Sequence, residues 1–91
     1  MKKYELKHIL LKYEYEAQDV LRKLQQGDNF EDLAKKFSIC STAPQGGFLG
    51  EFRPGRFVPL FEESVEELAE GQLSKPIRTQ FGYHLVIKTS K

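Results

Sequence analysis

Residues 4–11 constrain the fold of this chain more than any other segment. Their sequence, Tyr-Glu-Leu-Lys-His-Ile-Leu-Leu, alternates with the period of a β-strand, and the more polar face turns apolar at Ile9 and Leu11. A strand that is apolar on both faces is typical of the centre of a sheet that is covered on both sides. Residues 83–87 form a second buried strand, rich in β-branched and aromatic side chains.

Helical periodicity appears after the first strand. Within residues 14–26, one apolar stripe consists of Ala17, Val20, Leu21 and Leu24. Gly27 ends this helix, and Asp28 and Glu31 have the spacing of a capping box. The second stripe consists of Phe30, Leu33, Ala34 and Phe37. We therefore predict two short amphipathic helices joined by a tight turn.

The second half of the chain is broken by glycine and proline. Residues 38–59 form a loop that contains one short predicted strand, residues 48–52. Pro59 begins a third helix, which we expect Gly71 to end. A short extended piece at residues 77–78 and a turn at residues 80–82 lead into the last strand. The predicted order is β-α-α-loop-β-α-β-β.

Length and charge exclude several classes of protein. The 91 residues suffice for one domain, residues 1–91, without a linker or repeat. Fourteen basic and thirteen acidic side chains give a formal charge of +1, which argues against a nucleic-acid partner and a polybasic membrane anchor. We see no apolar run of membrane-spanning length and no secretory signal. One cysteine fits a reducing compartment. We expect a cytoplasmic monomer that has no membrane partner.

Three side chains could react or titrate near neutral pH. His8 and His84 lie within the first and last strands, and Cys40 begins the glycine-rich loop. If the two strands are neighbours, the imidazoles face each other at the centre of the sheet. A strand histidine is more often a structural residue than a catalyst, and a single cysteine is more often a small buried hydrophobe. No recognisable motif supports a Cys-His thiol enzyme, and the ligands for a zinc site are too few and too dispersed.

Aromatic side chains gather in the glycine-rich and turn segments. They are Phe48, Phe52, Phe57, Phe61 and Phe81. Small domains often use aromatic rings as core, and this interpretation suits Phe52. Five rings beside irregular backbone also predict a concave apolar pocket.

Five motifs, in order, resemble the parvulin family of peptidyl-prolyl cis/trans isomerases. They are Lys7-His8-Ile9-Leu10, Ser38-Ile39-Cys40-Ser41, the run from Gly46 to Phe52, Val58-Pro59-Leu60-Phe61-Glu62, and Gln80-Phe81-Gly82-Tyr83-His84-Leu85. The resemblance extends from about residue 4 to residue 88, almost the whole chain. It implies an α+β fold, with a four-stranded antiparallel sheet wrapped by about four helices.

The resemblance also implies residue roles. His8 and His84 match a histidine pair beneath the active site, Thr79 matches a hydroxyl linked to that pair, and Cys40 matches a position beside the substrate carbonyl. The proline ring would bind Leu49, Phe57 and Phe61, with Phe81 along the same groove. The implied activity is isomerisation of Xaa-Pro bonds during protein folding, without a metal or cofactor. The implied partners are proline-containing peptides and unfolded protein chains.

Two departures from the family pattern bear on substrate preference. Phe57 stands where methionine is common, and Phe48 stands where aspartate is common. The phosphate-directed members carry a basic cluster after the first strand, whereas residues 12–16 here hold one lysine and two glutamates. We therefore expect isomerisation that does not depend on phosphorylation. The alternative is a chaperone module that binds proline-containing segments without catalysis.

Overall fold

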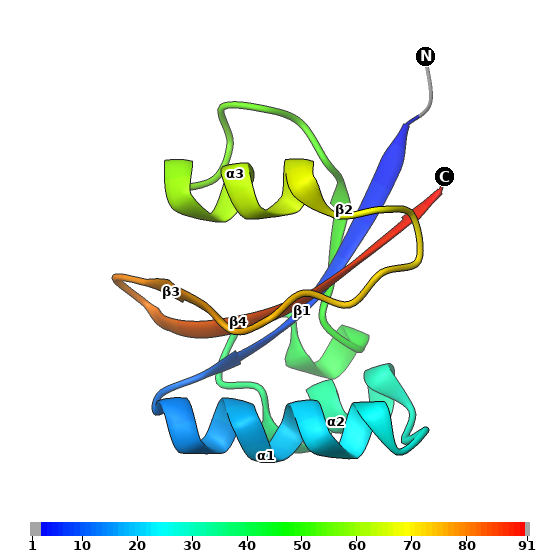
Figure 1. Cartoon of the computed structure of the whole chain (residues 1–91), viewed down its shortest axis with the longest axis vertical. Coiled ribbons are helices and arrows are strands. Elements are labelled where there is room, and N and C mark those ends of the chain that lie inside the picture. The colour runs from blue at the N-terminus through cyan, green and yellow to red at the C-terminus, as the bar shows by residue number, and fades with distance from the viewer. Residues whose placement is uncertain (1–2, 91) are drawn as a thin grey trace.

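Four strands form one antiparallel sheet in the order β2-β1-β4-β3 (Figure 1). The computed structural model describes residues 3–90. The strands are β1 (Tyr4–Leu11), β2 (Phe48–Glu51), β3 (Ile77–Thr79) and β4 (Gly82–Ser90). The two predicted two-faced strands, β1 and β4, are the central pair and run side by side from Tyr4 opposite Ser90 to Leu11 opposite Tyr83. The predicted α+β class and the four-stranded antiparallel sheet are confirmed.

Helices cover both faces of this sheet. The two helices α1 (Glu14–Gln25) and α2 (Phe30–Phe37) lie on one face, and α3 (Pro59–Glu67) lies on the other (Figure 1). A one-turn 3-10 helix, η1 (Ala43–Gln45), precedes β2, so the fourth helical element is a single turn. No helix formed by residues 3–90 has the length and apolar composition needed to cross a membrane.

Each face of the central strands has its own core. Ile9, Leu11 and Leu85 face α1 and α2 and pack with side chains such as Val20 and Leu33. On the opposite face, a second cluster consists of Leu6, Phe61, Val65, Ile77 and Val86. Alternation along β4 places His84 on this second face, between Tyr83 and Leu85, which belong to the first. The alternation read from residues 4–11 therefore assigns each side chain of β1 to the correct layer.

Two predicted helix ends were wrong by a few residues. The cap of α2 is Asn29 rather than Asp28, because its side chain accepts a hydrogen bond from the main-chain N–H of Asp32 at 2.9 Å. The third helix ends at Glu67, before Gly71. There the buried Lys88 ammonium donates to the carbonyls of Val65 and Leu68, at 3.2 and 3.0 Å, and so satisfies carbonyls at the end of the helix.

Candidate active site

A cavity of about 470 Å³ opens between α3, the centre of the sheet and the loops before and after β2. We call it the proline pocket, after the ring that the parvulin resemblance implies it would hold. It brings together seven of the eight side chains predicted for the site, which are His8, Cys40, Leu49, Phe57, Phe61, Phe81 and His84. Thr79, the eighth, is not part of the wall and lies behind His84, with its hydroxyl 2.7 Å from His84 Nε2. The wall also contains four residues that were not predicted for the site, Leu10, Gly55, Arg56 and Val58.

The two histidines form the floor of the proline pocket. Their strands are adjacent, and His8 Nδ1 lies 3.1 Å from His84 Nδ1. The rings stack at an interplanar angle of 20°, and both side chains are buried. Phe61 from α3 meets the edge of His84, with ring centroids 5.2 Å apart. The predicted meeting of the two imidazoles at the centre of the sheet is therefore seen in the structure.

Burial keeps both imidazoles neutral at physiological pH. Loss of hydration, and to a smaller extent the proximity of His84, lowers the pKa of His8 from 6.5 to about 4. Loss of hydration likewise lowers the pKa of His84 to about 4. Neither side chain is a strong general acid near pH 7, so the pair is suited to positioning and to hydrogen bonding.

The hydrogen bonds of the pair have two self-consistent proton arrangements. In one, the Thr79 hydroxyl donates to His84 Nε2, and His84 Nδ1–H donates to His8 Nδ1. In the other, His8 Nδ1–H donates to His84 Nδ1, and His84 Nε2–H donates to Thr79 Oγ1. The main-chain N–H of Phe81 donates to the same hydroxyl oxygen at 3.2 Å in either case. His8 Nε2 is buried and makes no hydrogen bond within residues 3–90.

Cys40 reaches the proline pocket because the segment after α2 is held against β1. The main-chain N–H of Ile39 donates to the Leu10 carbonyl at 2.8 Å. The Ser38 hydroxyl accepts from the N–H groups of Leu10 and Cys40, at 3.0 and 3.3 Å. These bonds fix the chain beside β1 and leave the Cys40 side chain partly exposed at the wall. The sequence motif Ser-Ile-Cys-Ser thus has a structural reason for its first serine.

A glycine is required where the next loop crosses β1. Gly47 accepts a hydrogen bond from the main-chain N–H of His8 at 2.9 Å and has a φ of 84°. A Cβ atom at this position would overlap the carbonyl oxygen of His8. The left-handed backbone and the close approach therefore both favour glycine. This contact connects the loop to the strand that carries the histidine.

Glu62 holds the loop that forms the outer wall of the pocket. Its Oε2 atom accepts hydrogen bonds from the main-chain N–H groups of Gly55 and Phe57, at 2.7 and 2.9 Å. Glu62 lies in the first turn of α3, where the helix dipole also favours a carboxylate. The clamped loop presents Phe57 and the exposed Arg56 to the pocket. In the sequence, Glu62 is visible only as an acidic residue in the first turn of a helix that begins with Pro59. Its partners are main-chain groups, which no sequence pattern reports.

The remaining aromatic side chains divide into wall and support. Phe57 packs on Phe61 with ring centroids 5.1 Å apart, and Phe52 packs on Phe57 from behind at 6.2 Å. Phe81 is 59% exposed and borders the mouth of the pocket. Phe48 is 40% exposed and is not part of the pocket wall, so this departure from the family pattern adds no contact there. Of the two expected departures, only Phe57 lines the pocket.

Residues 3–90 contain no group of three or more His, Cys, Asp and Glu side chains that could hold a metal ion. This part of the chain gives the pocket an apolar wall, one thiol, a neutral imidazole pair and one exposed guanidinium, with the Thr79 hydroxyl behind His84.

Comparison with known proteins identifies the family to which this chain belongs. Residues 8–90 match the family model of the rotamase, or PPIC-type PPIase, domain. The foldase protein PrsA of Caldanaerobacter subterraneus is 46% identical over 81 residues, which are 88% of this chain and 26% of that protein. The solution structure of NmPin, the parvuline of Nitrosopumilus maritimus, superposes with a TM-score of 0.87 at 38% identity, covering 98% of this chain and 97% of that chain.

A second similar structure comes from work on PEB4 and the periplasmic protein Cj1289, two SurA-like chaperones of Campylobacter jejuni. It has a TM-score of 0.89 and 33% identity, and it covers 97% of this chain and 38% of that chain. The chain thus spans about a quarter of the PrsA relative and nearly all of the parvuline. The fold is that of a parvulin-type domain. The chain belongs to the PPIC-type peptidyl-prolyl isomerase family.

Proposed function

We propose that this domain accelerates cis/trans rotation about Xaa-Pro bonds in folding polypeptides. The supporting observation is the proline pocket, in which an apolar wall of Leu49, Phe57 and Phe61 faces Cys40 and a neutral histidine pair. The family match and the foldase and parvuline relatives support the same activity. Proline-containing peptides and unfolded chains are the proposed substrates.

The reaction explains why so small a site suffices. Rotation about a peptide bond faces a barrier of about 18–20 kcal/mol because resonance is lost when the amide twists. The two Xaa-Pro isomers differ little in free energy, so a catalyst has only to lower this barrier. A twisted amide is less polar than a planar one, and an apolar wall therefore favours the twisted form. Holding the ring while the preceding carbonyl turns is preferential binding of the transition state.

We assign Cys40 an electrostatic or hydrogen-bonding role beside the substrate carbonyl, with no covalent intermediate. Amide rotation needs no proton transfer. The pair His8 and His84 then acts as a positioning scaffold. Thr79 fixes the orientation of the His84 ring through its 2.7 Å hydrogen bond. Phe57, where the family often has methionine, gives the pocket a rigid ring against proline.

We further propose that phosphorylation before proline is not required. Arg56 is the one charged side chain among the described residues that line the pocket, and it is exposed. A single exposed cation is a weak site for a doubly charged phosphate compared with a basic cluster. A phosphoserine-proline peptide is therefore expected to turn over no faster than its alanine-proline counterpart. A strong rise in turnover on phosphorylation would contradict this proposal.

The proposed activity is tested by an isomerisation assay on short Xaa-Pro peptides. We expect turnover by the wild-type protein, retained activity in Phe57→Met with a shifted preference for the residue before proline, and retained activity in Cys40→Asp. Binding and folding of each variant are followed in parallel by peptide titration and circular dichroism. A folded, peptide-binding Cys40→Asp variant without activity would show that the thiol has another role. A wild-type protein without turnover would refute the proposed function.

The second candidate is a chaperone module that holds proline-containing segments without catalysis. The observation in its favour is the large exposed ring of Phe81 at the mouth of the pocket, and the relatives of the chain include proteins named foldase and chaperone. Suppression of aggregation by a variant that lacks isomerase activity would support it.

Assembly and location are proposals that rest on the sequence. We propose a monomer, to be tested by sedimentation equilibrium. We propose a cytoplasmic location, to be tested by cell fractionation, although one structural relative is associated with a periplasmic protein.

A further inference from the structure

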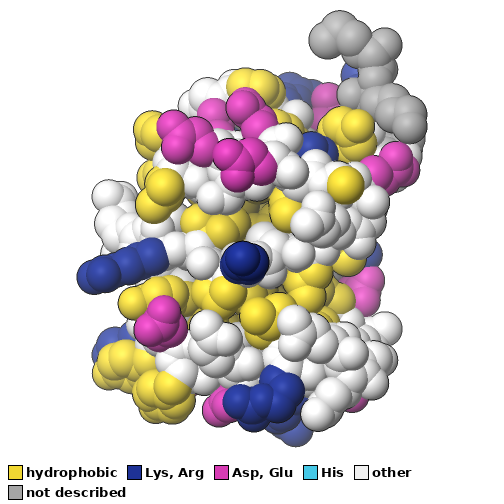
Figure 2. All heavy atoms as spheres, in the orientation of Figure 1, with side chains coloured by type: hydrophobic (Ala, Val, Ile, Leu, Met, Phe, Trp, Pro, Cys, Tyr) yellow, Lys and Arg dark blue, Asp and Glu magenta, His cyan; other side chains and the backbone are white. Residues whose placement is uncertain are grey.

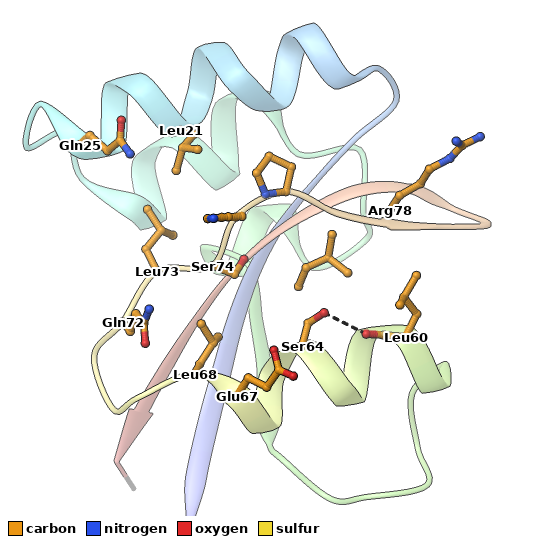
Figure 3. Close-up of a pocket in the computed structure, with 13 residues that line it drawn as sticks. Leu21, Gln25, Leu60, Ser64, Glu67, Leu68, Gln72, Leu73, Ser74 and Arg78 are labelled. Carbon is orange, nitrogen blue, oxygen red and sulfur yellow. Dashed lines mark hydrogen bonds between the residues drawn. The ribbon is translucent and has the colours of Figure 1, made fainter.

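A second hollow lies along the outer edge of β3, away from the proline pocket. It has a volume of about 740 Å³, and the outer edge of β3 lies between α1 and α3 within it (Figure 3). Leu60 and Ser64 belong to the wall formed by α3, and Leu21 belongs to the wall formed by α1. Figure 2 shows hydrophobic side chains across the middle of this face, below an acidic patch. We call this hollow the edge groove.

The side to which each main-chain N–H and C=O group of β3 points follows from hydrogen bonds made elsewhere in the sheet. Leu10 uses its N–H and C=O to bond Ser38 and Ile39, on the side away from β4. Leu10 is opposite His84, so the two form a pair without mutual main-chain bonds. His84 therefore directs its own N–H and C=O toward β3.

The same alternation leaves a main-chain donor and acceptor at the edge groove. Ile77 is opposite His84, and the two residues pair through their main-chain N–H and C=O groups. Because these groups alternate in direction along a strand, the next residue, Arg78, directs its N–H and C=O away from β4. Pro76 occupies the equivalent outward position on the other side of Ile77, where a missing N–H costs the sheet nothing. Edge strands with free main-chain groups pair readily with another extended chain.

We propose that the edge groove binds an extended polypeptide segment as an added strand beside β3. The Arg78 N–H donates to a carbonyl of the segment, and the Arg78 C=O accepts one of its N–H groups. Side chains of a strand point alternately to the two faces of a sheet. Those of the added segment would therefore meet the α3 wall, with Leu60 and Ser64, and the α1 wall, with Leu21. Addition of a strand to a free edge is a known mode of peptide recognition.

The preferred occupant is the same unfolded chain whose proline enters the proline pocket, and this part of the proposal rests on the proposed function. A small hollow at the β3–β4 turn shares Phe81 with the proline pocket and shares Arg78 with the edge groove. Each hollow thus shares a lining residue with the next one around the turn. Arg78 and Phe81 are three residues apart in the sequence, at most about 11 Å along an extended chain. A substrate therefore needs only a few residues between its proline and its paired segment.

The charges of the groove suit a mainly apolar and hydroxylated segment. Glu67 lies on the α3 side, and the exposed Lys75 and Arg78 lie on the strand side, so neither sign dominates. The apolar lining includes Leu68 and Leu73. These three charged side chains do not form the basic cluster that a strongly charged partner such as nucleic acid would need.

The test uses a proline-free peptide of about eight residues, the length of a typical strand, in which valine and threonine alternate between terminal glutamates. Isotope-labelled protein is titrated with it and followed by two-dimensional NMR. We expect amide shifts at Leu60, Arg78 and Leu21 rather than at Cys40 and Phe57. The same peptide methylated on alternate main-chain nitrogens cannot pair and should not bind.

Two variants separate main-chain pairing from side-chain charge. Arg78→Pro removes the outward N–H and should lower the affinity for the peptide about five- to tenfold, the loss expected for one main-chain hydrogen bond. The matched control Arg78→Ala keeps the N–H and should bind within about twofold of the wild type. A short Xaa-Pro peptide cannot reach the groove, so both variants should retain isomerase turnover of it. This control verifies that the β3–β4 turn is intact in each variant.

Three results would overturn the proposal. They are shifts confined to the proline pocket, equal binding of the methylated peptide, and unchanged affinity in Arg78→Pro. Groove resonances that shift with protein concentration alone would identify a second copy as the occupant and would also overturn it. If the short peptide is not isomerised by the wild type while the proline-free peptide still binds, the proposed function fails and the groove remains.

Discussion

Acidification should destabilise this domain through its histidine pair before its carboxylates are protonated. Above pH 6.5 both imidazoles are neutral in the folded and the unfolded chain and give no pH dependence. Below 6.5 the unfolded chain takes up protons that the folded pair, with pKa values near 4, does not. The free energy of unfolding therefore falls as the pH falls through this window.

The size of this effect follows from the two pKa shifts. Each pH unit within the window costs about 1.4 kcal/mol per histidine. Between pH ~7 and pH ~5 the loss is therefore about 2 kcal/mol for each histidine and about 4 kcal/mol for the pair. The two losses add because neither folded imidazole is protonated before the pH approaches 4. A domain of this size has a total stability of about 5–15 kcal/mol, so the effect is large.

Urea unfolding at a series of pH values measures this slope. His8→Asn and His84→Gln each remove one titrating group and should each remove about half of the loss, whatever their stability at neutral pH. Comparing slopes rather than absolute stabilities cancels the packing cost of each substitution. A wild-type loss below about 1 kcal/mol over this range, or equal slopes in the wild type and both variants, would refute the argument.

Three further substitutions test separate parts of the site. Thr79→Val removes the hydrogen bond to His84 and should lower kcat/KM about five- to tenfold in the short-peptide assay without changing the melting temperature much; loss of folding would contradict this. Glu62→Ala releases the loop that carries Phe57 and should raise KM by about tenfold, whereas Glu62→Gln keeps an acceptor oxygen and serves as the control. Gly47→Ala should destabilise the fold by at least about 2 kcal/mol in urea, since it introduces both a clash and a strained φ.

The layers of the fold could be predicted because period and burial coincide. Alternation in β1 separates Leu6 and His8 from Ile9 and Leu11, and the structure places these pairs on opposite faces. The sheet supports helices on both sides, as the two-faced strands require. The exact start of α2 was not predictable, because Asp28 and its neighbour are both good caps and the choice depends on one side-chain hydrogen bond.

The floor of the site was predicted only in part. Both histidines lie on the same face of neighbouring strands, but their contact depends on the register, which places Leu10 opposite His84. No side-chain pattern reports that register. The Glu62 clamp was missed for a similar reason, because its donors are main-chain groups that every sequence possesses. Arg56 was missed because an exposed cation in a loop has no distinguishing signal.

The pairing of the central strands has a consequence for the use of this fold in longer proteins. Tyr4 is directly opposite Ser90, so the chain enters and leaves the domain at the same end, with the two Cα atoms within about 6 Å. Figure 1 shows the start of β1 and the end of β4 at the same end of the sheet. Such a unit can be spliced into a surface loop of a host protein with almost no change in the separation of the host's cut ends. This geometry suits a domain that matches one quarter of PrsA and nearly all of a parvuline.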